Sequence, residues 1–226
     1  MGFIVIEGLD GAGKSTQVQK LTEYFTQQGN KCKFIHFPQM EQGIFGDLIA
    51  KFLRGDLGKI NEVHPYLVAL IYAGDRNDAA QQMQQWLDNG ITVIMDRYVY
   101  SNIAFQCAKI KGEAEKEELA NWILELEYNY FKIPRPDVNL FLDVPFEFTT
   151  KKLTESREGD DRKYLKGKQD IHEANLDFQR SVLEVYNWQI EHYKDFHRIN
   201  CIGNANEMLT PDEVFAKILE TLNFVH

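Results

Sequence analysis

The stretch GLDGAGKS, residues 8–15, constrains the fold of this chain more than any other part of the sequence. The apolar run FIVIE lies directly before it, and a helical pattern follows over residues 13–28. Its glycines permit backbone conformations that other residues rarely adopt, which a strand needs in order to turn sharply into a helix. The N-terminal region therefore predicts a strand, a glycine-rich loop and a helix in direct succession.

Short apolar runs alternate with amphipathic stretches along the rest of the chain. The predicted strands are Phe3–Ile6, Lys33–Phe37, Thr92–Met95, Val138–Leu142 and His197–Cys201. The predicted helices are Gly13–Gln28, Ile44–Leu53, His64–Asn89, Tyr100–Ala108, Lys116–Phe131, Phe146–Glu155, Asp170–Tyr193 and Pro211–Leu222. This alternation predicts an α/β fold, a five-stranded parallel sheet flanked by helices on both faces. The length of 226 residues fits a single domain over residues 1–226.

The composition narrows the classes of function. A net charge of −9 argues against a general nucleic-acid binder, whose surface is usually basic. No apolar run approaches the roughly 20 residues of a membrane-spanning helix, and the N-terminus shows no signal-peptide pattern. Cys32, Cys107 and Cys201 form no CxxC pair, which is typical of reduced thiols. We therefore expect a cytoplasmic protein that binds neither nucleic acid nor membrane.

The glycine-rich stretch also fits GxxxxGK[ST], the pattern of a phosphate-binding loop, or P-loop. Backbone N–H groups of such a loop, with the positive end of the following helix, bind phosphate oxygens. We expect Lys14 to reach the β- and γ-phosphates of a nucleoside triphosphate, and the Ser15 hydroxyl to bind Mg²⁺. The full set predicted to hold this triphosphate is Gly8, Gly11, Ala12, Gly13, Lys14, Ser15 and Thr16.

The P-loop identifies a ligand but not a reaction. The guanine-reading pattern NKxD of GTPases is absent from the sequence, and a motor ATPase or helicase usually needs a longer chain. A compact P-loop protein with a charged segment that can act as a lid points instead to a small-molecule kinase.

A second informative stretch is VIMDRYVYSNIAFQCAK, residues 93–109. Its apolar strand delivers Asp96 and Arg97 to the crevice at the carboxyl ends of the parallel strands, where such sheets bind ligands. Asp96 is a candidate Mg²⁺ ligand together with Ser15, and the planar fork of Arg97 suits a phosphoryl group. The alternatives are a strand-end turn residue for Asp96 and a surface salt bridge for Arg97.

Two further signals are weaker. Tyr72 and Arg76 lie four residues apart on a predicted helix, so they share a face and can meet a base. Taken alone, core packing beside a surface charge is the default explanation of this pair. The segment of residues 154–169 is dense in charge and is either a solvated loop or a mobile lid over phosphates. The cations that such a lid would use are Arg157, Arg162, Lys163 and Lys166.

Nearly the whole chain resembles the thymidylate kinases. The likeness rests on EGLDGAGKST at residues 7–16, FP at 37–38, FLRGDLG at 52–58, Tyr72 with Arg76, DRYVYSNIAFQ at 96–106 and PDVNLFLDV at 136–144. This resemblance implies the P-loop NTPase fold with a mobile lid. It also implies transfer of the γ-phosphate of ATP to dTMP, with Mg²⁺, to give dTDP and ADP in dTTP synthesis. It implies a homodimer formed through helices. The long apolar patterns at His64–Asn89 and Lys116–Phe131 are compatible with such an interface, and equally with core packing.

The resemblance also implies roles for single residues around dTMP. Asp10 would accept a hydrogen bond from the 3′-hydroxyl of the deoxyribose, and Tyr72 would stack on the thymine ring. Arg76 and Asn102 would bond the polar edge of the base, and Arg97 would bridge the monophosphate and the transferred phosphoryl group. The remaining residues implied to contact dTMP are Phe37, Arg54, Ser101, Phe105 and Gln106.

The P-loop departs from some family members at position 11, where they carry an arginine and this chain has Gly11. The resemblance then implies that a lid arginine, Arg157 or Arg162, supplies that positive charge. Two rival functions stay open from the sequence. One is a kinase for another deoxynucleoside monophosphate or a nucleoside, and the other is a non-catalytic ATP-binding module. Intact Lys14 and Asp96 speak against the second.

Overall fold

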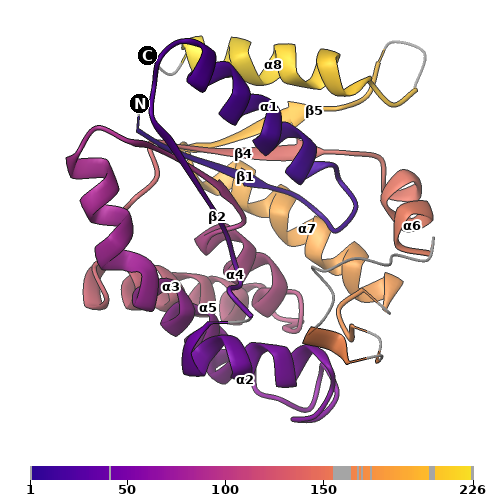
Figure 1. Cartoon of the computed structure of the whole chain (residues 1–226). Helices are drawn as coiled ribbons and strands as arrows, with labels where there is room; N and C mark the ends of the chain where they lie inside the picture. Colours follow the sequence, from indigo (N-terminus) through magenta and orange to yellow (C-terminus); the bar gives the residue numbers. More distant parts are fainter. Residues whose placement is uncertain are drawn as a thin grey trace.

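The structure, a computed structural model, describes residues 2–40, 42–154, 164–166, 168, 170–173, 175–203 and 207–224. Its strands form one sheet in the order β2-β3-β1-β4-β5, and each neighbouring pair is parallel (Figure 1). The strands are β1 Phe3–Glu7, β2 Cys32–His36, β3 Thr92–Asp96, β4 Val138–Asp143 and β5 Phe196–Asn200. The predicted five-stranded parallel sheet is confirmed, and every predicted strand bound lies within one residue of the observed one.

The position of each strand in the sheet follows from its composition. The central strands β1 and β3 are buried along their whole length, and their sequences FIVIE and TVIMD are almost continuously apolar. The edge strands β2 and β5 leave polar side chains exposed, in CKFIH and FHRIN. A strand covered on both faces needs apolar side chains on both, whereas an edge strand does not. Glu7 and Asp96, the last residues of the buried strands β1 and β3, therefore lie at the middle of the sheet, at the carboxyl ends of its strands.

Helices cover both faces of the sheet (Figure 1). On one face lie α1 (Lys14–Gln27) and α8 (Pro211–Phe224). On the other face lie α3 (Pro65–Asp88), α4 (Val99–Cys107), α5 (Glu113–Leu124) and α7 (Leu176–His192). The helix α2 (Gly43–Leu53) packs on α3, and α6 (Phe146–Thr154) follows β4. None of the helices within the described ranges is long and apolar enough to cross a bilayer.

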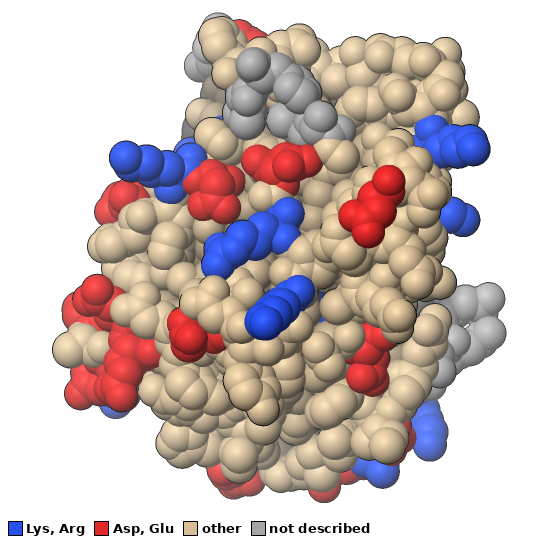
Figure 2. Space-filling view, turned by 90° about the vertical axis from the view of Figure 1, so that its left-hand side faces the viewer, with Lys and Arg blue, Asp and Glu red and all other residues tan. Residues whose placement is uncertain are grey.

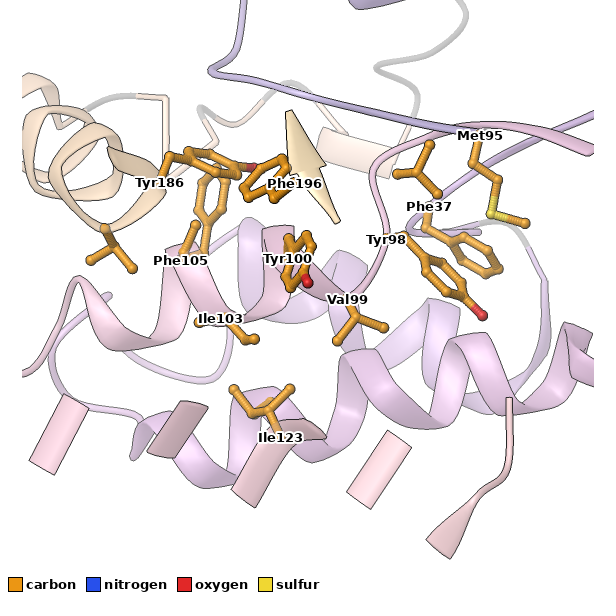
Figure 3. Packing of buried hydrophobic residues seen from close by; sticks show 14 of the residues in the cluster. Phe37, Met95, Tyr98, Val99, Tyr100, Ile103, Phe105, Ile123, Tyr186 and Phe196 are labelled. Atoms are coloured by element: carbon orange, nitrogen blue, oxygen red, sulfur yellow. The ribbon is translucent and has the colours of Figure 1, made fainter. Parts of the chain in front are cut away.

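Alternate side chains of β1 build two hydrophobic cores. Ile4 and Ile6 join the core under α1 and α8, whereas Phe3 and Val5 join the larger core under α3, α4, α5 and α7. Figure 3 shows part of this larger core, where Met95 of β3 packs with Phe37 and Tyr98, which follow β2 and β3. Burial of one such side chain contributes about 1.5–3 kcal/mol to stability. The two cores therefore fix the sheet edge from which the candidate site residues project.

Two predicted helices differ from the observed ones. The helix predicted over Lys116–Phe131 is α5 followed by a π-helix, η1 (Glu125–Tyr130), whose wider turns shift its side chains around the axis. The helix predicted over Asp170–Tyr193 was wrong at its start, because α7 begins only at Leu176. Asn175 caps α7 by accepting a hydrogen bond from the Phe178 N–H at 3.0 Å. Asp170 instead closes a separate turn by accepting from the His172 N–H at 2.8 Å.

Candidate active site

The P-loop joins β1 to α1 as predicted. Gly13, with a φ of 83°, is the residue just before α1, and its left-handed backbone favours glycine. A side chain at Gly8 would place its Cβ only 3.3 Å from the Ala12 Cβ and 3.4 Å from the Leu142 carbonyl oxygen. The first N–H groups of an α-helix have no partner within the helix and carry a partial positive charge. The start of α1 can therefore bind an anion.

Lys14 lies buried beneath this loop. Its Nζ donates a hydrogen bond to the Leu9 carbonyl at 2.9 Å and lies 4.0 Å from Oδ1 of Asp96. Burial and then the charge of Arg97 lower the pKa of Lys14, while the carboxylates of Asp96 and Asp10 oppose that shift. The side chain therefore crosses the P-loop and places a cation beside the carboxyl end of β3.

Asp96 stands at the carboxyl end of β3, next to the P-loop. Ser15 Oγ donates to its Oδ2 at 3.4 Å, and His36 Nδ1, at the end of β2, lies 3.6 Å from the same oxygen. Its Oδ1 is buried and has no hydrogen-bond partner in the described part of the chain. Burial acts to raise the pKa of Asp96, but Lys14 and His36 outweigh it and lower the pKa. Asp96 is therefore an ionised carboxylate whose Oδ1, 4.0 Å from the Lys14 ammonium, makes no hydrogen bond among the described residues. A carboxylate oxygen is the kind of ligand that a hard metal ion prefers.

Arg97 links the P-loop to α4. Its Nη2 donates to Asp10 Oδ1 at 2.7 Å, and its Nη1 donates to Ser101 Oγ at 3.0 Å. Gln179 Nε2 donates to the other Asp10 oxygen at 3.2 Å. Burial would raise the pKa of Asp10, but the charges of Arg97 and Lys14 hold the pKa well below its usual range. The Asp10 carboxylate is therefore ionised and anchored to Arg97.

The backbone of Arg97 is itself unusual, since its φ is 68° in a residue other than glycine. Its N–H donates to the Ile6 carbonyl at 3.0 Å, which continues the sheet one residue beyond β3. The guanidinium carbon lies 5.0 Å from the centre of the Phe105 ring. A left-handed conformation in a side-chain-bearing residue stores strain and is common at functional sites.

Glu7 underlies this arrangement, although the sequence reasoning did not select it. It is fully buried, and its Oε1 accepts from the N–H groups of Tyr98 at 2.9 Å and Ser101 at 3.1 Å. Its Oε2 accepts from Ser101 Oγ, and from the Tyr186 hydroxyl at 3.1 Å. Burial raises the pKa of Glu7, against hydrogen bonds from Ser101. The Glu7 carboxylate, which belongs to β1, binds N–H groups at the start of α4 and so holds the helix that carries Ser101 and Phe105. The sequence feature that could have identified Glu7 is that it is the charged residue ending the otherwise apolar strand FIVIE.

Arg76 of α3 and Asn102 of α4 meet at a buried glutamate. Arg76 donates from Nε to Oε2 of Glu127 at 2.5 Å and from Nη2 to Oε1 at 2.7 Å. Asn102 Nδ2 donates to the same Oε1 at 2.9 Å and to the Ala69 carbonyl at 3.1 Å. Tyr72 lies one turn before Arg76 on the same face of α3, which brings the two predicted base contacts together.

One cavity of about 870 Å³ joins these groups. The predicted residues that line it are Asp10, Gly11, Ala12, Gly13, Lys14, Ser15, Thr16, Phe37, Tyr72, Arg76, Asp96, Arg97, Ser101, Asn102, Phe105 and Gln106. Of the predicted residues that the structure describes, Gly8, Arg54 and the candidate lid cation Lys166 do not line it. The parallel topology therefore gathers side chains from separate stretches of sequence around one space, as the strand-end rule predicts.

Arg54 serves a different contact from the one expected. Its Nε donates to Asp56 Oδ2 at 2.8 Å and its Nη1 to the Tyr164 carbonyl at 2.7 Å. The side chain thereby ties the end of α2 to the segment that follows residue 163. Arg157 and Arg162, the predicted lid cations, lie outside the described residues.

Asp170 and His172 line the cavity without having been predicted as site residues. The His172 ring packs between Phe52, at 5.4 Å between ring centres, and Phe105, at 5.0 Å. Burial raises the pKa of Asp170 to about 6, although the Tyr164 hydroxyl donates to it at 2.7 Å. These two residues sit in the turn before α7, which the sequence assigned to a helix, and this error concealed them.

Comparison with known proteins shows the family of this chain. The family model described as "Thymidylate kinase" matches residues 6–208. The chain belongs to the thymidylate kinase family. The likeness predicted from the sequence motifs is thus confirmed over nearly the whole chain.

Curated thymidylate kinases share this likeness. The enzyme of Mycobacterium tuberculosis (strain CDC 1551 / Oshkosh) is 34% identical over 145 residues, which cover 64% of this chain and 67% of that protein. The thymidylate kinase of Plasmodium falciparum (isolate 3D7) is 29% identical over 194 residues, covering 82% of this chain and 86% of that protein. A solved thymidylate kinase from Candida albicans has a TM-score of 0.73 and 26% identity, covering 99% of this chain and 92% of that one. The fold is therefore the P-loop NTPase fold of the thymidylate kinases.

Proposed function

We propose that the cavity is the active site of a phosphotransferase that moves the γ-phosphate of ATP to dTMP, giving dTDP and ADP for dTTP synthesis. Membership of the thymidylate kinase family supports this reaction. The observation that carries it is that the P-loop and the Tyr72–Arg76–Asn102 group line one cavity of about 870 Å³. The ion pair between Asp10 and Arg97, at 2.7 Å, connects the two groups. The cavity can therefore hold a triphosphate and a nucleotide acceptor at once.

ATP is held by the P-loop. The N–H groups of Gly11–Thr16 surround the β- and γ-phosphates, and the Lys14 ammonium reaches the same oxygens by leaving the Leu9 carbonyl. Its neighbours Asp10 and Asp96 keep the ammonium inside the site. Lys14 thereby lowers the repulsion between the triphosphate and an incoming phosphate.

Ser15 and Asp96 are the residues that would hold Mg²⁺. The unpartnered Oδ1 of Asp96 and the adjacent Ser15 hydroxyl are oxygen ligands of the kind this ion prefers. Within the described ranges no three acidic, histidine or cysteine residues cluster to hold a metal, so phosphate oxygens would complete its ligands. When bound, Mg²⁺ neutralises charge on the transferred group. His36 fixes the Asp96 carboxylate from the side of β2.

The acceptor dTMP lies against α3 and α4. Tyr72 stacks on the thymine ring, Arg76 and Asn102 bond its polar edge, and Phe105 lies beside the sugar. Asp10, ionised and anchored by Arg97, accepts from the 3′-hydroxyl of the deoxyribose. The P-loop therefore touches both substrates, through its amides on one side and its aspartate on the other.

Arg97 directs the transfer itself. Its fork already binds Asp10 and Ser101, so the guanidinium is oriented before substrate arrives. From there it bridges the monophosphate of dTMP and the transferred phosphoryl group, bringing together two anions that repel each other. The family resemblance implies that Arg157 or Arg162, both outside the described residues, adds further positive charge.

The protein acts as a cytoplasmic homodimer. Its cysteines are free thiols, with Cys107 and Cys201 buried, which suits a reducing compartment. Exposed apolar side chains lie on α3, at Leu67 and Leu70, and on α2, at Ile44. Figure 2 views the side on which α3 lies in Figure 1, and uncharged surface covers much of its lower half. Apolar surface of this kind marks protein–protein contacts.

A coupled assay of ADP release tests the reaction. The protein with Mg²⁺ and ATP receives in turn dTMP, dUMP, dCMP, dGMP, UMP and thymidine. We expect a strong preference for dTMP. Preference for another acceptor would overturn the assignment of the base pocket while keeping the kinase, and no turnover of any acceptor would overturn the proposed reaction. The breadth of the panel matters because broad substrate specificity is described for the thymidylate kinase of Candida albicans.

A further inference from the structure

Glu127 is a fully buried carboxylate outside the predicted site. It lies in η1, and the wider turn of this π-helix directs it toward α3 and α4. Both of its oxygens bond Arg76, from Nε at 2.5 Å and from Nη2 at 2.7 Å. Such a two-point bond fixes the plane and direction of a guanidinium. Arg76 is 2% exposed, so the pairing is held within the protein and determines which N–H groups face the cavity.

The same carboxylate determines how the Asn102 amide is turned. Asn102 Nδ2 donates to Glu127 Oε1 at 2.9 Å and to the Ala69 carbonyl at 3.1 Å. A backbone carbonyl can only accept, so a flipped amide would set the Asn102 oxygen against two acceptors. The nitrogen therefore faces the protein. The Asn102 Oδ1 is left buried, without a hydrogen-bond partner among the described residues, in a side chain that lines the cavity.

These contacts place a donor beside an acceptor. Arg76 offers N–H groups to the cavity, and Asn102 offers an oxygen. Without Glu127 only the Ala69 carbonyl would hold the amide nitrogen inward, and a flipped amide would turn a second donor toward the ligand. A buried acceptor without a partner is unfavourable unless a ligand satisfies it. A ligand that donates to Asn102 and accepts from Arg76 is therefore favoured.

We propose that Glu127 is a positioning residue that orients Arg76 and Asn102 so that they select pyrimidines with an acceptor at position 4 and a donor at position 3. Thymine and uracil present O4 and N3–H in this order, whereas cytosine presents an amino group at position 4 and an unprotonated N3. The inference rests on the proposed function, which places the base against these two residues. With cytosine, the Arg76 donor would face the amino donor at position 4, and the Asn102 oxygen would face the N3 acceptor. These two mismatches would discriminate strongly against cytosine.

The test compares dTMP with 5-methyl-dCMP, because both carry the 5-methyl group and differ only at the edge that Arg76 and Asn102 contact. We measure kcat and KM for each in the wild-type protein and in Glu127→Gln. Glutamine keeps the shape but replaces one acceptor oxygen with a donor. We expect the preference for dTMP, as the ratio of kcat/KM values, to fall at least about tenfold. The loss should appear mainly in KM for dTMP, with KM for ATP changed less than about twofold.

Two further variants distinguish a positioning role of Glu127 from a general effect of its substitution on the stability of the protein. Glu125→Gln alters an exposed glutamate of the same π-helix, bonded only to Asn129 among the described contacts, and should leave the preference unchanged. In an Asn102→Ala background, Glu127→Gln should reduce the preference less than it does in the wild-type protein, because only the route through Arg76 remains. A preference that Glu127→Gln alters by less than about twofold overturns the proposal, as does an effect of equal size in the Asn102→Ala background.

The outcome remains decisive if Glu127→Gln fails to fold. The wild-type protein must then prefer dTMP over 5-methyl-dCMP by at least about a hundredfold, and Asn102→Ala alone must reduce that preference. Comparable turnover of both nucleotides by the wild-type protein overturns the inference while keeping the kinase. No turnover of dTMP at all overturns the proposed function instead, so the two failures are distinct.

Discussion

Among the single residues of the site, Arg97 makes the most demanding set of contacts. It has a left-handed backbone, donates to Asp10 and Ser101, and lies within 3.3 Å of the Tyr186 hydroxyl. These partners come from the P-loop, α4 and α7, so one guanidinium joins three elements. Glu7 holds two of the same partners from below, through the Ser101 and Tyr186 hydroxyls. Strain in the Arg97 backbone is therefore maintained by a network that also orients its charge.

Arg97→Lys should lower kcat/KM for dTMP at least about a hundredfold, or roughly 3 kcal/mol, because a lysine keeps the charge but not the planar fork. Steady-state kinetics measure this, with a melting curve to confirm folding. Arg180→Lys is the matched control, since Arg180 is exposed and stacks on Phe146 at 4.5 Å outside the cavity. A loss of tenfold or less in Arg97→Lys would remove Arg97 from the transfer step.

Asp170 makes stability depend on pH. Burial raises its pKa to about 6 in the folded protein, whereas an unfolded aspartate titrates near 3.9. Between these values the folded state binds more protons than the unfolded state, so stability falls as pH rises through this window. Asp170→Asn cannot ionise and escapes this loss. Relative to wild type, the variant should gain up to about 3 kcal/mol between pH 4 and pH 7.

Urea unfolding of both proteins at the two pH values measures this difference, and the exposed Asp177→Asn is the control. A difference between Asp170→Asn and wild type that stays constant from pH 4 to pH 7 would contradict the raised pKa.

The predictable part of the site is the part that local sequence encodes. The P-loop pattern locates Lys14 and Ser15 because consecutive residues build that cradle. Glu7 and Glu127 are different, because their importance arises from partners that lie 91 to 179 residues away for Glu7 and 25 to 51 residues away for Glu127. A glutamate in a strand or helix looks like an ordinary residue until the fold buries it. Burial of a paired charge is thus a tertiary property that the sequence does not display.

At the scale of elements, the start of α7 decides where Asp170 and His172 lie. Apolar periodicity continues through the turn, so it predicted one helix from Asp170 onward. The side chains of Asp170 and Asn175 instead bind nearby backbone N–H groups, at 2.8 Å to His172 and 3.0 Å to Phe178. Aspartate and asparagine compete with the helix in this way. The central strands β1 and β3, by contrast, were predictable to within one residue because burial on both faces imposes continuous apolar runs.

Asn175→Ala should lower the free energy of unfolding by about 1 kcal/mol, because it removes the side-chain acceptor at the first turn of α7. Urea denaturation at pH 7 measures the change. Ser181→Ala, inside the same helix, removes only a hydrogen bond to the Asp177 carbonyl at 3.2 Å and should be nearly neutral. Equal effects of the two substitutions would show that the cap does not hold the start of α7.

At the scale of the whole molecule, the sheet separates two different surfaces. The α1 and α8 face lies above the sheet in Figure 1, and α3 with α2 lies below it. Exposed apolar side chains occur on both, at Phe224 of α8 (82% exposed) and at Leu67 of α3 (57% exposed). The proposed dimer uses the α3 side, where several such residues occur on neighbouring helices.

Sedimentation should give twice the chain mass of 26.3 kDa for the wild-type protein. Leu67→Lys buries a charge in the proposed interface and should shift the mass toward that of one chain. Phe224→Lys makes the same kind of change on α8 and should leave the mass unaltered. If Phe224→Lys dissociates the protein and Leu67→Lys does not, the dimer uses the other surface.

The central claim is that one cavity holds both nucleotides with their phosphates facing each other across Arg97. The most direct test is calorimetric binding of a molecule in which adenosine and thymidine are joined through their 5′-oxygens by one chain of phosphates. If both sites share the cavity, the linked molecule should bind at least about a hundredfold more tightly than ATP or dTMP alone, because its second half binds intramolecularly. An affinity no better than that of the tighter single nucleotide would contradict a shared site.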